Sequence, residues 1–125
     1  MTIHIKRVYE PLGPEDGLRI LVDRLWPRGL SKERANLDCW AKDLAPSDEL
    51  RRWFGHDPYK WEVFKTRYFL ELEAKIDIIQ EILEKAQHRV NLTLLYGAKD
   101  TQCNNVQALL EFLLEKPRKN LKRLP

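Results

Sequence analysis

The residues best suited to chemistry gather in one short stretch, Asp23-Arg24-Leu25-Trp26-Pro27-Arg28-Gly29. A tight turn would need only the proline and the glycine. Arginine presents a planar fork that binds a phosphate or carboxylate through two hydrogen bonds. We therefore interpret Arg24 and Arg28 as anion binders. The Asp23 carboxylate would orient them or accept a hydrogen bond from a ligand hydroxyl.

Two predicted strands would position this stretch. Residues 18–22 form an apolar run that leads directly into Asp23, and residues 89–96 form a second run that leads into Gly97. Continuous apolar runs are typical of strands buried on both faces of a parallel sheet. Ligands of open α/β sheets bind at the carboxyl ends of the strands. If the two strands run parallel, as we expect, their following loops meet at one cleft.

The predicted cleft also receives groups from the last helix and the intervening segments. The amino end of a helix offers unpaired N–H groups and partial positive charge to an anion. We expect a small phosphorylated or carboxylated ligand, including a nucleotide. The alternative reading is a purely structural ion pair between Asp23 and Arg24. The predicted ligand-binding residues are Asp23, Arg24, Arg28, Lys32, Ser47, Lys99, Asp100 and Asn104.

Two side chains are candidates for catalysis. Histidine is the side chain type best suited to general base catalysis near neutral pH, so His56 is a candidate base, or it could make a loop or capping contact. Cys103 is predicted in the first turn of the last helix, where a thiolate is stabilised. A nucleophile needs a neighbouring base, and none is placed beside Cys103 by the sequence. The four tryptophans are read as core residues. The reaction type, or whether there is one, stays open.

The remaining elements are indicated by periodicity and capping signals. Ile3 to Tyr9 alternates like a strand. The predicted helical segments are Ser31 to Arg34, Leu37 to Leu44, Ser47 to Phe54 with a stop at Gly55, Asp57 to about Gln87, and a last helix that Asp100 or Thr101 caps and Lys116-Pro117 ends. This order predicts a single α/β layered domain over residues 1–115, with a small, mostly parallel sheet covered by helices.

Several classes of protein are disfavoured by composition. The chain has 125 residues and two isolated cysteines, which is neither a disulfide framework nor a zinc spacing. We expect no metal site, and no cofactor because the chain lacks a glycine-rich phosphate loop. No apolar window is long enough to span a membrane. The amino-terminal residues do not resemble a signal peptide, so we expect a cytoplasmic location and no membrane partner.

The basic charge lies mainly in the last ten residues. Residues 116–125 contain five basic side chains and no acidic one, whereas the whole chain carries a net charge of only +3. We expect a loose basic tail. It favours an alternative function, association with nucleic acid through the tail and the motif arginines. A module that binds a partner without catalysis is a further alternative. The oligomeric state is not indicated.

The Val22–Gly29 string resembles the YeaO-like proteins, a branch of the domain of unknown function DUF 488. The shared positions also include Asp16-Gly17, Lys32, Trp40, Lys42, Pro46-Ser47, Leu50-Arg51, His56, Phe64, Tyr68 and Thr93-Leu94-Leu95-Tyr96. The resemblance extends from Lys6 to Leu114 and implies an α/β fold, but no substrate. Members often carry Asn-His-Ala near the start of the last helix. Here Asn105 and Val106 follow Asn104, so a catalytic histidine at that position would be missing.

Overall fold

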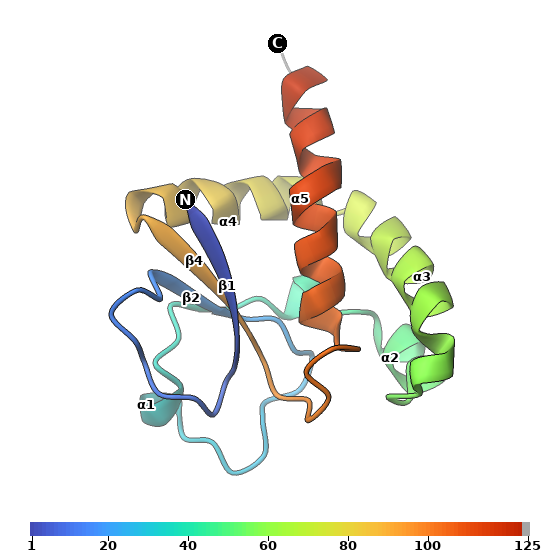
Figure 1. The fold of residues 1–125 in the computed structure, drawn as a ribbon, viewed down its shortest axis with the longest axis horizontal. Helices are drawn as coiled ribbons and strands as arrows, with labels where there is room; N and C mark the ends of the chain where they lie inside the picture. The colour runs from blue at the N-terminus through green and yellow to red at the C-terminus, as the bar shows by residue number, and fades with distance from the viewer. Residues whose placement is uncertain (124–125) are drawn as a thin grey trace.

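A single sheet of four strands lies at the centre of the molecule (Figure 1). The computed structural model describes the backbone of residues 1–123 and the side chains of residues 1–115. The strands are β1 Thr2–Arg7, β2 Leu18–Leu21, β3 Cys39–Trp40 and β4 Asn91–Tyr96, in the order β1-β4-β2-β3. All paired strands are parallel. The predicted parallel pairing of β2 with β4 is therefore confirmed.

The helices follow the capping signals in most places. Their bounds are α1 Lys32–Ala35, η1 Lys42–Leu44, α2 Asp48–Phe54, η2 Pro58–Lys60, α3 Trp61–Glu73, α4 Ile76–His88 and α5 Asn105–Arg123. Ser47 and Asp57 cap α2 and η2 through their side chains, as predicted, and Gly55 ends α2 in a left-handed conformation. Within residues 1–123, no helix has the length and apolar character needed to cross a bilayer.

The two faces of the sheet bury different kinds of side chain. Because successive residues of a strand point to opposite faces, Ile20 packs in the larger core with residues of α2–α5, and Leu21 packs in a smaller core beside α1. The larger core includes Phe64 and Tyr68 of α3. The predicted α/β layered domain is confirmed, with its longer helices gathered on one face.

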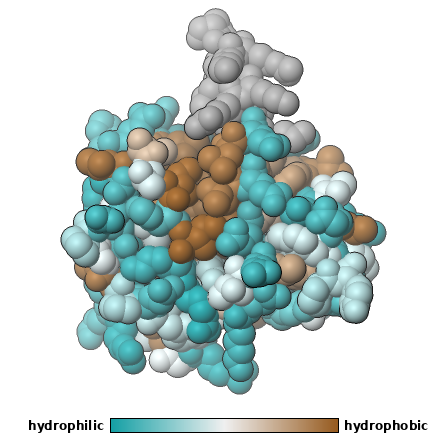
Figure 2. Space-filling view, in the orientation of Figure 1, coloured by the Kyte–Doolittle hydropathy of each residue, from teal (hydrophilic) through white to brown (hydrophobic). Residues whose placement is uncertain are grey.

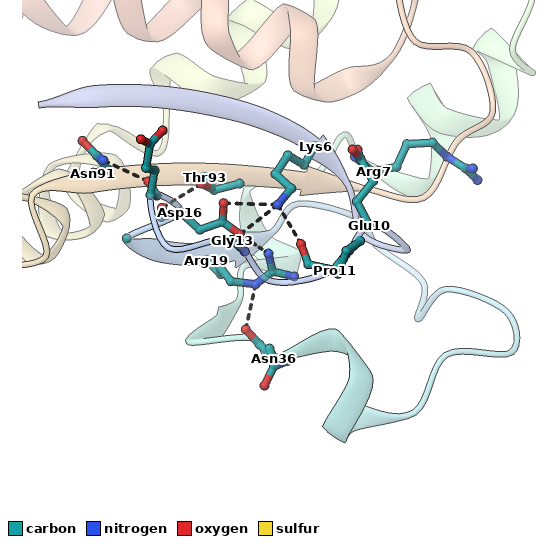
Figure 3. A network of polar contacts seen from close by, with 12 residues as sticks. Lys6, Arg7, Glu10, Pro11, Gly13, Asp16, Arg19, Asn36, Asn91 and Thr93 are labelled. Carbon is teal, nitrogen blue, oxygen red and sulfur yellow. Dashed lines mark hydrogen bonds and ion pairs between the residues drawn. The ribbon is translucent and has the colours of Figure 1, made fainter.

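A buried polar network occupies the α1 face of the sheet (Figure 3). The Arg19 side chain is 1% exposed, and its guanidinium lies 2.5 Å from Asp16 Oδ2. It also donates to the backbone carbonyls of Ala35 and Asn36, at 2.9 and 3.0 Å. Lys6 Nζ lies 3.1 Å from the same Asp16 oxygen. This network ties β1, β2 and the segment after α1 together. The apolar run of residues 18–22 predicts only apolar burial along β2, so this buried network is a finding of the structure.

Gly17 allows β2 to start close beside β4. It has a φ of 64°, and a Cβ atom there would lie 2.1 Å from the Asn91 carbonyl oxygen. No other residue type fits such an approach between two backbones. The Thr93 hydroxyl donates to the Asp16 carbonyl at 2.7 Å and fixes the same turn. The register of the central strands, and with it their common carboxyl edge, depends on this contact.

Two predicted helices are wrong in their bounds. The helical spacing of Leu37 to Leu44 belongs instead to β3 and η1, because backbone pairing with β2 outweighs so short a periodic signal. The predicted long helix is divided into α3 and α4. At the break, Ala74 N–H bonds to Glu71 O and Lys75 N–H to Leu72 O. These tighter turns let both helices pack on the same core.

The last helix also differs from its prediction at both ends. Its cap is Asn104, whose Oδ1 accepts from Gln107 N–H at 2.9 Å, while Asp100 turns the preceding loop by accepting from Gln102 and Cys103. α5 continues past Pro117 to Arg123. Proline removes one helical hydrogen bond, but the lysines and arginines that follow favour helix. The prediction of a loose tail falls on residues 116–125, whose side chains lie outside the described part of the chain.

Candidate functional site

A pocket of about 320 Å³ opens at the carboxyl edge of the sheet. It lies between the loops that follow β2 and β4, the segment containing α2, and the start of α5. Pockets that hold small ligands span roughly 300–1,000 Å³ and occur at this edge of parallel sheets. Its lining residues are Tyr9, Asp23, Arg24, Leu25, Trp26, Pro27, Arg28, Pro46, Arg51, Phe54, His56, Phe64, Gly97, Ala98, Asn104 and Asn105.

Asp23 is held in place by backbone and side-chain contacts. Its Oδ2 accepts from the Gly97 N–H at 2.8 Å, and its backbone carbonyl accepts from Trp40 Nε1 at 2.7 Å. The Asn105 side chain bonds to the Asp23 carboxyl and donates to the Val22 carbonyl. The pocket wall thus joins the ends of β2 and β4 to the amino end of α5.

The environment of Asp23 disfavours its charge. Burial raises the pKa of the Asp23 carboxyl to about 6, although the hydrogen bonds from Gly97 and Asn105 and the charge of His56 lower it. No lysine or arginine forms a salt bridge with Asp23 among the described side chains. A protonated Asp23 can donate a hydrogen bond, whereas an ionised Asp23 can only accept one. Asp23 can therefore form a hydrogen bond with a polar group in the pocket in either state.

Three arginines reach the pocket from different segments. Arg24 Nε donates to the Pro46 carbonyl at 2.9 Å, and Arg24 forms no ion pair with Asp23. The structural ion pair considered from the sequence is therefore wrong: the guanidinium turns toward the segment before α2. Arg28 is exposed at the rim. Its carbonyl accepts from the Tyr9 hydroxyl at 2.9 Å, which fixes the rim loop to the segment after β1.

Arg51 of α2 brings an unsatisfied donor. Its terminal nitrogen lies 2.7 Å from Asp48 Oδ1. Its Nε is shielded from solvent and has no hydrogen-bond partner within the described part of the chain. A buried N–H without an acceptor costs roughly 1–3 kcal/mol. Arg51 also lines the pocket.

Aromatic and proline side chains form the apolar walls. Phe54 and Phe64 stack at 4.3 Å between ring centroids, and both line the pocket. Trp26 packs edge-on against Trp40 at 5.2 Å and donates to the Leu30 carbonyl at 2.6 Å. Trp26 is partly buried, packs against the smaller core and also lines the pocket. These contacts anchor the loop 24–30 through Trp26, which lies between its two arginines.

The structure brings half of the predicted ligand-binding set together. Asp23, Arg24, Arg28 and Asn104 line the pocket. Four predicted residues do not line it: Lys32, Ser47, Lys99 and Asp100. Lys32 and Lys99 are exposed to solvent. Ser47 is used as the cap of α2 and donates to Glu71 Oε2 at 2.6 Å, and Asp100 is used by its own loop.

The two catalytic candidates differ in position. His56 lines the pocket and follows Gly55 in a left-handed conformation, with φ of 58°. Cys103 is absent from the pocket lining and precedes α5 instead of lying in its first turn. Burial, and then the charge of Asp100, raises the pKa of the Cys103 thiol. The predicted stabilisation of a Cys103 thiolate is therefore wrong.

Sequence reasoning missed several lining residues. Arg51 lies on a helix whose capping signals gave no reason to place it near Asp23. Phe54 and Phe64 lie within predicted helices, and they are core residues that also line the pocket. Asn105 was noted only as a departure from a family pattern. Among the described residues, no group of histidine, cysteine and acidic side chains is arranged to hold a metal ion.

Comparison with known proteins assigns the family. A family model described as the inactive DUF488-N3 subclade matches residues 2–123. The chain belongs to this family. This chain is 42% identical to the uncharacterised protein YeaO of Escherichia coli K12 over 113 residues. The aligned residues cover 90% of this chain and 97% of YeaO. The chain is 47% identical over 111 residues to the uncharacterised protein Rv3073c of Mycobacterium tuberculosis H37Rv, covering 89% and 92%. No solved structure matches the chain.

These comparisons confirm the YeaO-like, DUF 488 resemblance read from the motif. The structure adds the location of the departure at Asn105. This residue lies in the pocket wall of the DUF488-N3 chain and bonds to Asp23. A histidine at this position would place a titratable ring beside the Asp23 carboxyl, whereas asparagine offers only an uncharged amide.

Proposed function

We propose that the pocket binds a small molecule that carries a phosphate or carboxylate group on an apolar body. Three arginines line the pocket together with one acid, Asp23, whose charge burial disfavours. The single observation that carries the proposal is the Arg51 Nε–H, which is buried without a partner among the described residues. Phosphate and carboxylate oxygens are the acceptors that guanidinium groups bind best.

The apolar walls support a ligand larger than a bare ion. Phe54, Phe64 and Trp26 offer ring surfaces, and such surfaces bury the apolar part of a ligand while a few polar groups fix its orientation. The Asp23 and Asn105 side chains would accept from, or donate to, an N–H or hydroxyl on that body. A nucleoside monophosphate has all of these features, and an aryl phosphate has the charged group and the apolar ring.

We infer binding without catalysis. The matching subclade is described as inactive. In the pocket, the candidate base His56 lacks the predicted thiol nucleophile, because Cys103 does not line the pocket and burial raises the pKa of its thiol. The DUF488-N3 chain would then act as a ligand-binding domain of the cell interior.

Calorimetric titration with charged and neutral probes tests this proposal. Phenyl phosphate, benzoate and a nucleoside monophosphate should bind, and benzyl alcohol, which keeps the ring but lacks the charge, should bind at least about tenfold more weakly, since a lost charged hydrogen bond costs about 1.5–3 kcal/mol. Arg51→Met and Arg28→Gln should weaken the binding of the anionic probes. Arg34→Gln, on exposed α1, is the matched control. Failure of every anion to bind at millimolar concentration would overturn the proposal.

The nucleic-acid alternative concerns residues 116–125, whose side chains lie outside the described residues. Truncation after residue 115 separates the two functions. Binding to nucleic acid would disappear with the basic residues and would weaken steeply with salt. Binding of phenyl phosphate in the pocket would be unchanged.

A further inference from the structure

The outer edge of β1 is open for pairing. β1 is an edge strand, joined to the sheet only through β4. Val8 N–H, just after the strand, bonds to the Tyr96 carbonyl, and the neighbouring Arg7 N–H bonds instead to Glu10 Oε2. Because peptide groups alternate in direction along a strand, those of Ile3 and Ile5 point away from the sheet. Glu10 closes one end of this edge and leaves residues 3–5 open.

Residues 3–5 of this edge lack the usual protection against pairing. Natural edge strands are blunted by proline, by a bulge or by a charge pointing inward. β1 reads Thr-Ile-His-Ile-Lys-Arg and contains no proline. Its only pairing follows a regular register from Thr2 to Arg7 against β4. The Lys6 side chain does not guard the edge, because it is held on the α1 face by Asp16.

An apolar patch adjoins this edge. Figure 2 shows hydrophobic side chains gathered over β1 and the neighbouring side of α5. Ile3 and Ile5 are partly buried and pack against the larger core, and Leu110 is half-buried. Met1 and Leu114 are 57% and 47% exposed. Such a patch beside an open strand edge is typical of a protein-binding surface.

We propose that β1 pairs antiparallel with β1 of a second copy of this chain, across a two-fold axis at His4. In this register Ile3 faces Ile5 of the second copy, and each pair exchanges two backbone hydrogen bonds. Thr2 faces Lys6 of the second copy, so no like charges lie directly opposite. The two sheets become one continuous sheet. A two-fold axis normal to that sheet keeps both α5 helices on the same face and joins the two apolar patches.

The strand itself favours a second copy over an unrelated peptide. Its open groups are self-complementary about His4, as a two-fold interface requires. The isoleucines that supply the outward peptide groups also supply the apolar side chains on the α5 face. An arbitrary extended peptide would satisfy the hydrogen bonds, but it would not bring the apolar patches of two copies together.

Cross-linking of the full chain tests the register. At the two-fold axis His4 faces its own copy in a pair without backbone bonds, where Cα atoms lie about 4.5 Å apart, a separation that suits a disulfide. We expect His4→Cys to give a covalent dimer on oxidation. Thr2→Cys, which keeps the same native cysteines but lies away from the axis, should stay monomeric in denaturing gels.

Sedimentation tests the surface independently. The wild type should sediment as a dimer that dissociates on dilution. Leu114→Glu should raise the dissociation constant of the dimer at least about tenfold, which corresponds to about 1.4 kcal/mol. Leu70→Glu is the matched control, because Leu70 on α3 is 65% exposed and lies on another element. A wild type that stays monomeric at millimolar concentration would overturn the proposal. So would a dimer that neither Leu114→Glu weakens nor His4→Cys traps.

Discussion

The Asp23 carboxyl and the Gly97 N–H meet across the ends of the two central strands, at 2.8 Å. A Cβ atom at Gly97 would lie 3.0 Å from the same carboxyl oxygen. The contact closes the base of the pocket and holds an acid in a setting that disfavours its charge.

Stability should therefore fall as the pH rises through the range in which Asp23 ionises. Its pKa is about 6 in the folded chain and 3.8 as an ordinary carboxyl. Between these values the folded state holds the proton more tightly than the unfolded state, so ionisation favours unfolding until the pH passes about 6, and the loss is constant above that. Such a shift corresponds to at most about 3 kcal/mol, and solvent screening reduces it to about 1–2 kcal/mol.

Asp23→Asn isolates this effect in urea unfolding measured at several pH values. Asparagine still accepts from Gly97 but does not ionise. At about pH 4 the variant and the wild type should be nearly equal in stability, and at about pH 8 the variant should be more stable by about 1–2 kcal/mol. A variant that keeps the wild-type pH dependence would show that another group is responsible.

The Arg19–Asp16 pair should be among the costliest polar contacts to break. Both residues are buried, and Arg19→Met leaves the Asp16 carboxylate with Lys6 as its remaining salt-bridge partner. Removing one member of a buried pair costs about 3–5 kcal/mol. Arg52→Gln is the control, because Arg52 pairs with Asp48 in the open, with 75% of its side chain exposed, and should cost less than about 1 kcal/mol. Equal losses in chemical denaturation would refute the prediction.

Replacing Val90 with glycine should stabilise the folded protein. It adopts a φ of 72° between α4 and β4, and it is 70% exposed. The left-handed conformation costs a side-chain-bearing residue about 1–2 kcal/mol, and an exposed valine returns little through burial. Val90→Gly should thus raise the free energy of unfolding by about 1 kcal/mol. Val63→Gly inside α3 should lower it by a similar amount, and a loss of stability in both variants would contradict the account.

Local signals in the sequence predicted much of the frame. The apolar runs gave β2 and β4, Ser47 and Asp57 marked helix starts, and the motif arginines lie at the pocket as expected from parallel strands. What local signals miss is contact between distant segments. Arg19 looks like a solvated charge until Asp16 and the carbonyls after α1 surround it. β3 has only two residues, too few to show alternation.

The pocket was predicted only in part for the same reason. Residues directly after a strand inherit their position from the sheet, so Asp23, Arg24 and Arg28 could be placed. Arg51 and Phe54 reach the pocket because α2 packs against α3, an arrangement with no local signature. Lys99 and Asp100 follow a strand as well, but they do not line the pocket. The Asp100 carboxylate instead accepts hydrogen bonds from the backbone of its own loop.

The most direct test of the central claim is the nuclear magnetic resonance signal of the Arg51 Nε–H group during titration with phenyl phosphate. An oxygen that binds this donor should move the signal downfield in a saturable way, together with the backbone amides of Gly97 and Asn105. The Nε–H of Arg34 should not respond. Shifts confined to residues 116–125, or an Arg51 signal that stays unchanged while phenyl phosphate binds, would contradict a pocket built for an anion.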